Sequence, residues 1–413
     1  MDNNFNTPAP SDSTAQINAP LKSTPKPGRK NSLILAAAIL FVLISATVTE
    51  LLLLTQAANN PSGSPQLKGT AGVTVVPTTL DEIARDSAWC GAFQLVWNDM
   101  KNEMVGDDVV FYPQLQEVVN LNKGTFTASM LSSDYYYKTY GLKTLKLKNQ
   151  IERAIKDKFN ETSAVLDGID WSNNTLDNPD DPDVRRFLFY AMLKRKFDYQ
   201  YKLNKLDNQK FGDYENVAYF GTKHVRSEAY DQFKALYFNS KDDFAIQITT
   251  DKQDNEVIFV KNPQGTTFAE IYRNMNSKAA SYKGSRSFQV SDRYIDDFKA
   301  PNLTLNVKKN YVELTRNKFR ISKSPDGRFA WMGEIMAAIQ TIQFQLDEKG
   351  GSIKSEAGIE GLGKGFALLE RERPEPEYRN FYLDDTFAVF LRESGKTQPY
   401  FAARVNDITK FQQ

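Results

Sequence analysis

The most pronounced hydrophobic pattern in the chain is a continuous apolar segment near its N-terminus. It runs from Leu33 to Leu54 and is broken only by three hydroxyl residues and Glu50. A helix of that length spans the hydrocarbon layer of a bilayer, about 30 Å thick. Glu50 lies near the end of the segment, where a carboxylate reaches the lipid headgroups. The pattern predicts one transmembrane helix over residues 33–55.

The charges on either side of this segment predict its orientation. Four basic residues lie between positions 22 and 30, and the next one is Lys68. Because basic residues stay on the cytoplasmic side, we expect a cytoplasmic N-terminus and an extracellular domain. A cleaved signal peptide ending near Thr55–Ala57 is the alternative. The length of the apolar run and of the tail before it favours an uncleaved signal anchor.

Composition divides the rest of the chain. Residues 1–32 are rich in Asn, Pro, Ser and Thr and predict a disordered cytoplasmic tail. Residues 56–78 are rich in Pro and Gly and predict a linker. Residues 79–413 then form one folded domain.

The domain begins with patterns of helical period. Thr79–Glu82 has the spacing of a helix N-terminal capping box, and apolar residues follow it on one face as far as Met100. We expect a helix there, and further helices over Leu142–Asp157 and Val184–Lys196.

After about residue 215 the period changes to that of strands. We expect a hairpin from 245–248 and 256–260, strands over Asn302–Val307 and Thr341–Leu346, and a closing hairpin from Tyr382–Leu391 and Pro399–Val405. Helices followed by strands predict an α+β fold with large mixed or antiparallel sheets and N-terminal helices.

Composition excludes several classes of site. Formal net charge is +1, which gives no reason to expect a nucleic-acid partner. Cys90 is the only cysteine and lies in an apolar run, so we expect a buried structural thiol and no intrachain disulfide. His224 is the only histidine and lies in a polar stretch, where we expect it at the surface. Neither has the partners that hydrolase, redox or zinc chemistry needs, so we expect no catalytic residue, no metal and no cofactor.

Two remaining motifs favour ordinary structure. Gly358–Gly365 is similar to a phosphate-binding loop, but Gly365 follows Lys364 where that loop needs Ser or Thr for Mg²⁺. We interpret the acid pairs Asp180-Asp181 and Asp384-Asp385 as turn or cap residues. Neighbouring residues on a strand point to opposite faces, so such a pair cannot easily act on one substrate.

The last third of the chain resembles the serpins. Ala338–Gly351 is similar to the central strand and hinge of that family. Phe387–Arg392 followed by Pro399–Asp407 is similar to its C-terminal hairpin, and Asp292–Leu305 to another of its strands. The resemblance covers about half of the domain; residues 105–180 match poorly.

The resemblance implies a hinge at Glu348, Lys349, Gly350 and Gly351, followed by a reactive loop. The family's distance from hinge to attacked bond places a scissile bond at Lys364-Gly365, and a lysine there implies a trypsin-like protease. Gly351, Ile353 and Lys354 depart from the family's usual Thr and Ala residues.

An inserting loop must also be able to form a strand with one buried face. Alternate residues from Gly351 to Ile359 are small or apolar, which permits insertion. An ordinary edge strand would show the same alternation, so both interpretations stay open.

We therefore expect a serpin-like α+β domain on a membrane anchor. The expected function is a serine-type protease inhibitor that acts through an exposed reactive loop after Glu348, and not an enzyme. A non-inhibitory cell-surface or envelope interaction module is the alternative, and an enzyme that uses carboxylates alone is a third.

Overall fold

The computed structural model describes residues 71–171, 177–178, 181–290, 294–322, 332–353 and 377–412. The expected anchor over Leu33–Leu54 and the loop from 354 to 376 lie outside these ranges. Among the helices of the described residues, none has both the length and the apolarity to cross a membrane.

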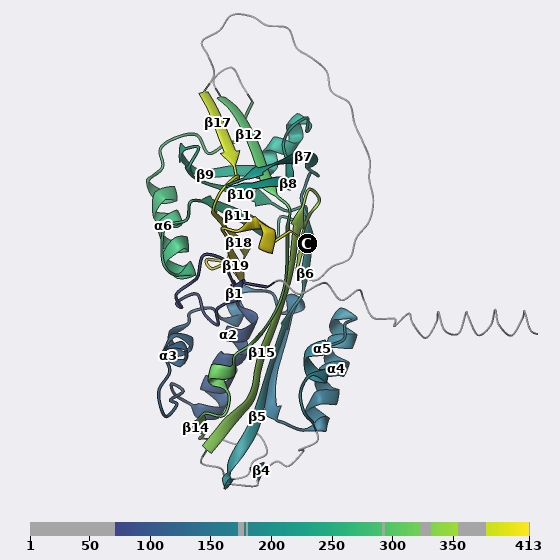
Figure 1. Cartoon of the computed structure of the whole chain (residues 1–413), viewed down its shortest axis with the longest axis vertical. Helices are drawn as coiled ribbons and strands as arrows, with labels where there is room; N and C mark the ends of the chain where they lie inside the picture. The colour runs from purple at the N-terminus through teal and green to yellow at the C-terminus, as the bar shows by residue number, and fades with distance from the viewer. Residues whose placement is uncertain are drawn as a thin grey trace, which may run out of the picture. The chain divides into compact units, whose positions relative to one another are not determined.

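An eight-stranded mixed sheet, with β5 and β15 as its longest strands, runs between helices of the domain (Figure 1). Its main order is β3-β5-β15-β16-β6, with β13 and β14 paired to β15 and β4 paired to β5. The strands are β3 (Tyr136–Leu142), β4 (Asp177–Asn178), β5 (Asp181–Leu193), β6 (Arg195–Asp198), β13 (Leu303–Asn310), β14 (Lys318–Arg320), β15 (Met332–Asp347) and β16 (Gly350–Ile353).

Two further sheets complete the β structure. A seven-stranded sheet, in the order β1-β2-β19-β18-β11-β10-β9, comprises β1 (Thr74–Val75), β2 (Ser87–Cys90), β9 (Phe233–Ser240), β10 (Asp243–Thr249), β11 (Asn255–Lys261), β18 (Phe387–Glu393) and β19 (Phe401–Val405). A four-stranded sheet, in the order β17-β12-β8-β7, comprises β7 (Asn204–Phe211), β8 (Tyr214–Gly221), β12 (Tyr294–Pro301) and β17 (Glu377–Tyr382).

Helices α2 (Ala92–Asp99), which continues as a π-helix over Met100–Val105, and α4 (Leu145–Phe159) pack on opposite faces of the eight-stranded sheet (Figure 1). Helix α3 (Gln116–Lys123) lies beside α2, and α5 (Ala164–Asp167) lies beside α4. Helix α6 (Phe268–Ser281) packs instead on the seven-stranded sheet. Short 3-10 turns occur at Ala128–Met130, Ser133–Tyr135, Ser227–Gln232, Val312–Leu314 and Ile408–Lys410.

The helix α4 illustrates why these residues fold as they do. Its N-cap Thr144 accepts a hydrogen bond from the Leu147 amide at 3.2 Å. Its buried residues recur every fourth position and pack against Leu188 and Tyr190 of β5. The expected helix over Leu142–Asp157 is thus confirmed, with a later start because β3 includes Leu142.

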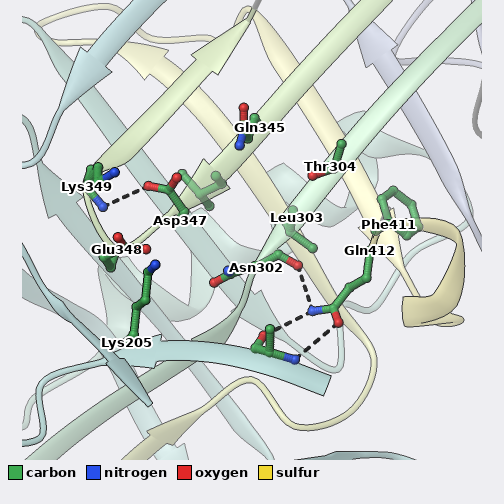
Figure 2. A pocket seen from close by; sticks show the side chains of 12 residues that line it. Lys205, Asn302, Leu303, Thr304, Gln345, Asp347, Glu348, Lys349, Phe411 and Gln412 are labelled. Carbon is green, nitrogen blue, oxygen red and sulfur yellow. Dashed lines mark hydrogen bonds between the residues drawn. The ribbon is translucent and has the colours of Figure 1, made fainter. Parts of the chain in front are cut away.

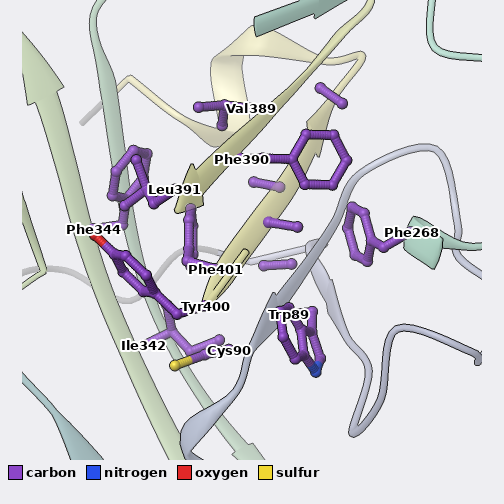
Figure 3. Packing of buried hydrophobic residues seen from close by; sticks show 14 of the residues in the cluster. Trp89, Cys90, Phe268, Ile342, Phe344, Val389, Phe390, Leu391, Tyr400 and Phe401 are labelled. Carbon is purple, nitrogen blue, oxygen red and sulfur yellow. The ribbon is translucent and has the colours of Figure 1, made fainter. Parts of the chain in front are cut away.

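The seven-stranded sheet supplies much of the aromatic core. Trp89 of β2, Phe390 of β18 and Phe268 of α6 are all buried on it (Figure 3). The expected hairpin of β10 and β11 is confirmed, with Ile246 opposite Phe259. The closing hairpin of β18 and β19 is also confirmed, although Tyr382 belongs to β17 in another sheet.

The helix expected from Thr79 to Met100 is wrong in its first half. The Thr78 amide donates to Asp81 Oδ2 at 2.8 Å, so the capping residues close a turn rather than begin a helix. Ser87–Cys90 then forms β2, fully buried between β1 and β19. A short apolar run suits either element, and here the neighbouring strands decide.

The helix expected over Val184–Lys196 is also wrong, because this segment forms β5 and β6. β5 lies between two strands and is covered on both faces: α4 packs on Leu188 and Tyr190, and the main core packs on Phe187 and Phe189. A strand buried on both faces loses the polar–apolar alternation that identifies strands in sequence.

A buried ion pair fixes β17, the first described strand after residue 376. Arg379 Nε donates to Asp296 Oδ1 of β12 at 2.7 Å, and both side chains are almost fully buried. The same guanidinium donates to the carbonyl oxygens of Ser285 (2.6 Å) and Ser287 (2.7 Å). The Arg379 side chain therefore joins β17 to β12 and to residues 285–287.

We expect Asp296→Ala to lower the free energy of unfolding by about 3–5 kcal/mol, because it leaves a buried guanidinium without its carboxylate. Urea denaturation of the full chain measures this. The control is Asp167→Ala, which removes an exposed partner of Lys148 at 3.3 Å and should cost under about 1 kcal/mol. Equal losses in the two variants would contradict the expectation.

Candidate functional site at the hinge turn

The two longest strands of the eight-stranded sheet separate along their length. β5 and β15 are parallel neighbours from Val184 opposite Met332 to Tyr190 opposite Ile339. Beyond that point they no longer pair with each other. The C-terminal part of β15 pairs instead with β16, and β16 pairs with β6.

β16 therefore lies between two strands rather than at an edge. It is antiparallel to β15, with Gly350 opposite Asp347 and Ile353 opposite Phe344. On its other side Ile353 is opposite Arg195. Of the two interpretations left open by the sequence, an edge strand continuing from residue 346 is thus wrong for residues 350–353, because the chain reverses at residues 348–349.

A gap separates the tip of β16 from the upper end of the β5–β15 pairing. In the described part of the chain, residues 340–343 of β15 pair only with β13, on the opposite edge. Residues 191–194 face them across the gap. A strand that continued from β16 would enter here first.

Glu348 and Lys349 form the turn between β15 and β16, which we call the hinge turn. The Lys349 amide donates to Asp347 Oδ1 at 2.8 Å. The Glu348 carbonyl accepts from the Leu203 amide (2.9 Å), and the Lys349 carbonyl accepts from the Tyr199 amide (2.8 Å). These bonds fasten the hinge turn to the segment after β6.

Gly350 and Gly351 allow β16 to approach β6 closely. Gly350 has φ +148°, and a Cβ there would lie 2.4 Å from the Phe197 carbonyl oxygen. A Cβ on Gly351 would lie 2.4 Å from the Phe197 ring. Only glycine satisfies both the dihedral angle and the space at position 350.

A buried glutamine ties β15 to the neighbouring sheet inside the gap. Gln340 Nε2 donates to the Cys90 carbonyl at 2.9 Å, and its Oε1 accepts from the Tyr311 hydroxyl at 2.8 Å. All three residues are buried, which confirms the burial expected for Cys90. Burial raises the pKa of its thiol to about 11, so the nucleophilic thiolate is disfavoured.

A second buried group lies where β16 ends. Arg195, the first residue of β6, is 1% exposed and pairs with Glu393 (2.9 Å) and Asp254 (3.2 Å). Its guanidinium also lies 4.1 Å from the centre of the Tyr135 ring. The pairs link the eight-stranded sheet to β18 and to the turn after β10.

The other candidate residues are not brought to the hinge turn. His224 is exposed, as expected, and Asp384 and Asp385 lie in the turn between β17 and β18. Lys364 and Gly365, Asp180, and the loop similar to a phosphate-binding motif lie outside the described residues. Within the described ranges, no group of three or more His, Cys, Asp or Glu residues could hold a metal ion.

The sequence interpretation missed Arg195 and Gln340. A polar residue on the otherwise apolar face of a strand, as Gln340 is beside Ala338 and Ile342, is the signal that could have indicated a buried hydrogen-bond network. Arg195 carried no comparable signal, because its acids lie about 60 and 200 residues away in sequence.

No model of a known protein family matches the chain, and no curated protein matches its sequence. Its structure is similar to solved serpin structures. A serpin from the trematode Schistosoma haematobium is 13% identical over 62% of each chain, with a TM-score of 0.34. Native protease nexin-1 with heparin is 11% identical over 68% of this chain and 79% of that one (TM-score 0.38). A complex of thyroxine-binding globulin with thyroxine is 12% identical over 66% and 76% (0.34). The chain spans 62% of the length of the trematode serpin that it matches.

We expect Gly350→Ala to destabilise the fold by about 1–3 kcal/mol more than Gly395→Ala. Gly395 is a matched control, since it also has positive φ (+77°) but a Cβ there would meet nothing within 4 Å. Chemical denaturation of both variants measures the difference. If the two lose the same stability, close approach to Phe197 does not constrain β16.

Proposed function

We propose that the domain is a divergent serpin-fold protease inhibitor whose reactive loop follows Glu348 and inserts into the eight-stranded sheet. The observation that carries the proposal is the position of β16. The chain after the hinge turn already forms a strand between β15 and β6, and the gap continues its path.

Insertion has a clear energetic basis. For β16 to lengthen beyond the gap, β5 and β15 must separate and lose seven residue pairs. The inserted strand would then pair with both, so one row of backbone hydrogen bonds is replaced by two. Apolar residues at alternate loop positions would also be buried.

The far end of the loop explains why cleavage would be needed. Residues 354–376 connect β16 in the eight-stranded sheet to β17 in the four-stranded sheet. Arg379 and Asp296 hold β17 in place. A loop fixed at both ends cannot extend fully into the sheet, whereas a cut loop can, so a protease that attacks the loop would trigger insertion.

A non-inhibitory interaction module is the second candidate function. The buried bonds of Gln340 to Cys90 and Tyr311 hold β15 against β2 and oppose rearrangement of the gap. One of the similar structures is a complex of thyroxine-binding globulin with thyroxine. In this case β16 would be a fixed strand.

Two elements of the proposal come from the sequence. The apolar segment Leu33–Leu54 would anchor the domain outside the cell, with the N-terminus in the cytoplasm. Lys364-Gly365 would be the scissile bond, and a trypsin-like enzyme the target.

We expect cleavage between Ile359 and Phe366 to raise the melting temperature by several degrees, because β16 lengthens and buries loop residues, each apolar one worth about 1.5–3 kcal/mol. Scanning calorimetry before and after verified cleavage measures the change. Ile359→Asp should abolish the gain, because Ile359 lies beyond β16 and its replacement would carry a carboxylate into the sheet only on insertion. Ile359→Ala, which adds no charge, should retain part of it. An unchanged melting temperature after cleavage favours the non-inhibitory module.

We expect Lys364→Leu to abolish covalent trapping of trypsin-like proteases while leaving the fold intact, because their specificity pocket pairs an acid with the substrate cation. Covalent complexes on a denaturing gel measure trapping. Arg371→Leu and Arg373→Leu are matched controls that should still trap. Trapping by Lys364→Leu at the original level would move the scissile bond to another residue of the loop.

A further inference from the structure

The cavity of about 360 Å³ beside the hinge turn holds charges of both signs. Two lysines and two acids line it together: Lys205, Lys349, Asp347 and Glu348. Lys205 extends toward Glu348 (Figure 2). The charges in this cavity are therefore balanced within the chain. Backbone groups without a partner lie elsewhere, along an edge of the eight-stranded sheet.

The strand β3 forms this edge. It pairs with β5 on one side, and no other described strand pairs with its second side. Just before β3, the Tyr135 carbonyl accepts from the Lys194 amide at 2.8 Å. Just after it, the Lys143 amide donates to the Arg186 carbonyl at 3.0 Å. The odd-numbered residues therefore direct their backbone groups toward β5, and the even-numbered residues direct theirs away from it.

The backbone groups directed away from β5 have no hydrogen-bond partner among the described residues. They belong to Tyr136, Lys138, Tyr140 and Leu142. A row of unpaired amides and carbonyls is a template for an added strand. Helix α4 is centred on β5, between Tyr137 of β3 and Ala337 of β15, so it does not cover this row.

Charged side chains protect exposed edges against pairing, and β3 has little of this protection. Its one charged residue, Lys138, is paired with Asp99 of α2. On the other side of the sheet, β13 carries the exposed Lys308. The Thr304 amide of β13 also donates to the Phe411 carbonyl at 2.6 Å. β3 is therefore better suited than β13 to strand addition.

The sequence of β3 is complementary to itself when two copies pair antiparallel about Thr139, its middle residue. Tyr136 is then opposite Leu142 of the second copy, an apolar pair on the face toward α2. On the face toward α4, Tyr137 is opposite Gly141, which leaves space for the ring. Every residue directed away from β5 is paired in this register, and each pair exchanges two backbone hydrogen bonds.

The charges fit the same register. Lys138 is opposite Tyr140 of the second copy, and the Tyr140 hydroxyl donates to Glu103 Oε2 at 2.9 Å. Glu103 is exposed and forms no ion pair among the described residues. Lys138 of each copy is thus placed near an acid of the other copy that has no cation. A register that puts the two Lys138 side chains opposite each other is disfavoured by their repulsion.

We propose that two copies of this chain associate edge to edge through β3, antiparallel about a two-fold axis at Thr139. The eight-stranded sheets of the two copies join into one continuous sheet. The contact uses the same surface of both copies, so it closes as a dimer. This association is independent of the proposed function, because β3 lies on the opposite side of β5 from β15 and the gap.

The first test is disulfide trapping in the full-length chain. Thr139→Cys should give a disulfide-linked dimer on a non-reducing denaturing gel, because opposite Cβ atoms come closest at a non-hydrogen-bonded pair such as the one on the axis. Lys308→Cys, on the exposed part of β13, is the matched control and should stay monomeric. The native Cys90 is buried and does not contribute. Equal amounts of dimer from the two variants, or none from either, would overturn the proposal.

The second test is the dissociation constant of the dimer, measured by sedimentation equilibrium of the full-length chain in detergent. Lys138→Pro removes an outward-directed amide and should weaken the dimer at least tenfold. Lys308→Pro removes an equivalent outward-directed amide of β13 and should leave the constant unchanged. Both variants keep the hydrogen bonds that join their strand to the sheet, so both should fold. Equal constants for the two variants would contradict an interface at β3.

Amide hydrogen exchange identifies any other occupant of the edge. In the dimer, the even-numbered amides of β3 should exchange slowly, and more slowly as the protein concentration rises. Slow exchange in a chain that sediments as a monomer would mean that a segment of the same chain covers β3. Fast exchange in a monomer would leave the edge open to a different protein. Either result rules out the dimer, and neither bears on loop insertion.

Discussion

The two-sided pairing of β16 is the constraint on which the rest of the domain depends. This four-residue strand is hydrogen-bonded to β15 on one side and to β6 on the other. It can occupy that position only because Gly350 and Gly351 admit the Phe197 backbone and ring. As a result, β15 pairs with β5 along its N-terminal half and with β16 near its C-terminal end.

Buried polar groups mark the boundaries of this arrangement. Gln340 lies in the gap and binds the backbone of β2, while Arg195 lies at the tip of β16 and binds acids from the seven-stranded sheet. Each has donors or acceptors that would be left unpaired in the protein interior if the sheets shifted. Such groups specify one register more strongly than apolar packing alone can.

The sequence predicted some elements well and others poorly, for physical reasons. The helix α4 and the β10–β11 hairpin have one buried and one exposed face, so their periodicity survives in the sequence. β5 is covered on both faces and all four residues of β2 are buried, so neither shows a diagnostic period. The hinge segment could be located by family resemblance, but its insertion beside β6 depends on a partner about 150 residues away. No local pattern encodes such a contact.

Cys90, the single cysteine, offers a way to detect opening of the sheet. The Cys90 backbone carbonyl accepts from Gln340, and its thiol is buried beside the gap. A thiol reagent reaches it only in molecules where the core around β2 and β15 has opened. The ratio of its alkylation rate to that of an unstructured cysteine would equal the population of the opened state. The alkylation rate of the native Cys90 thiol thus reports how often the sheet opens.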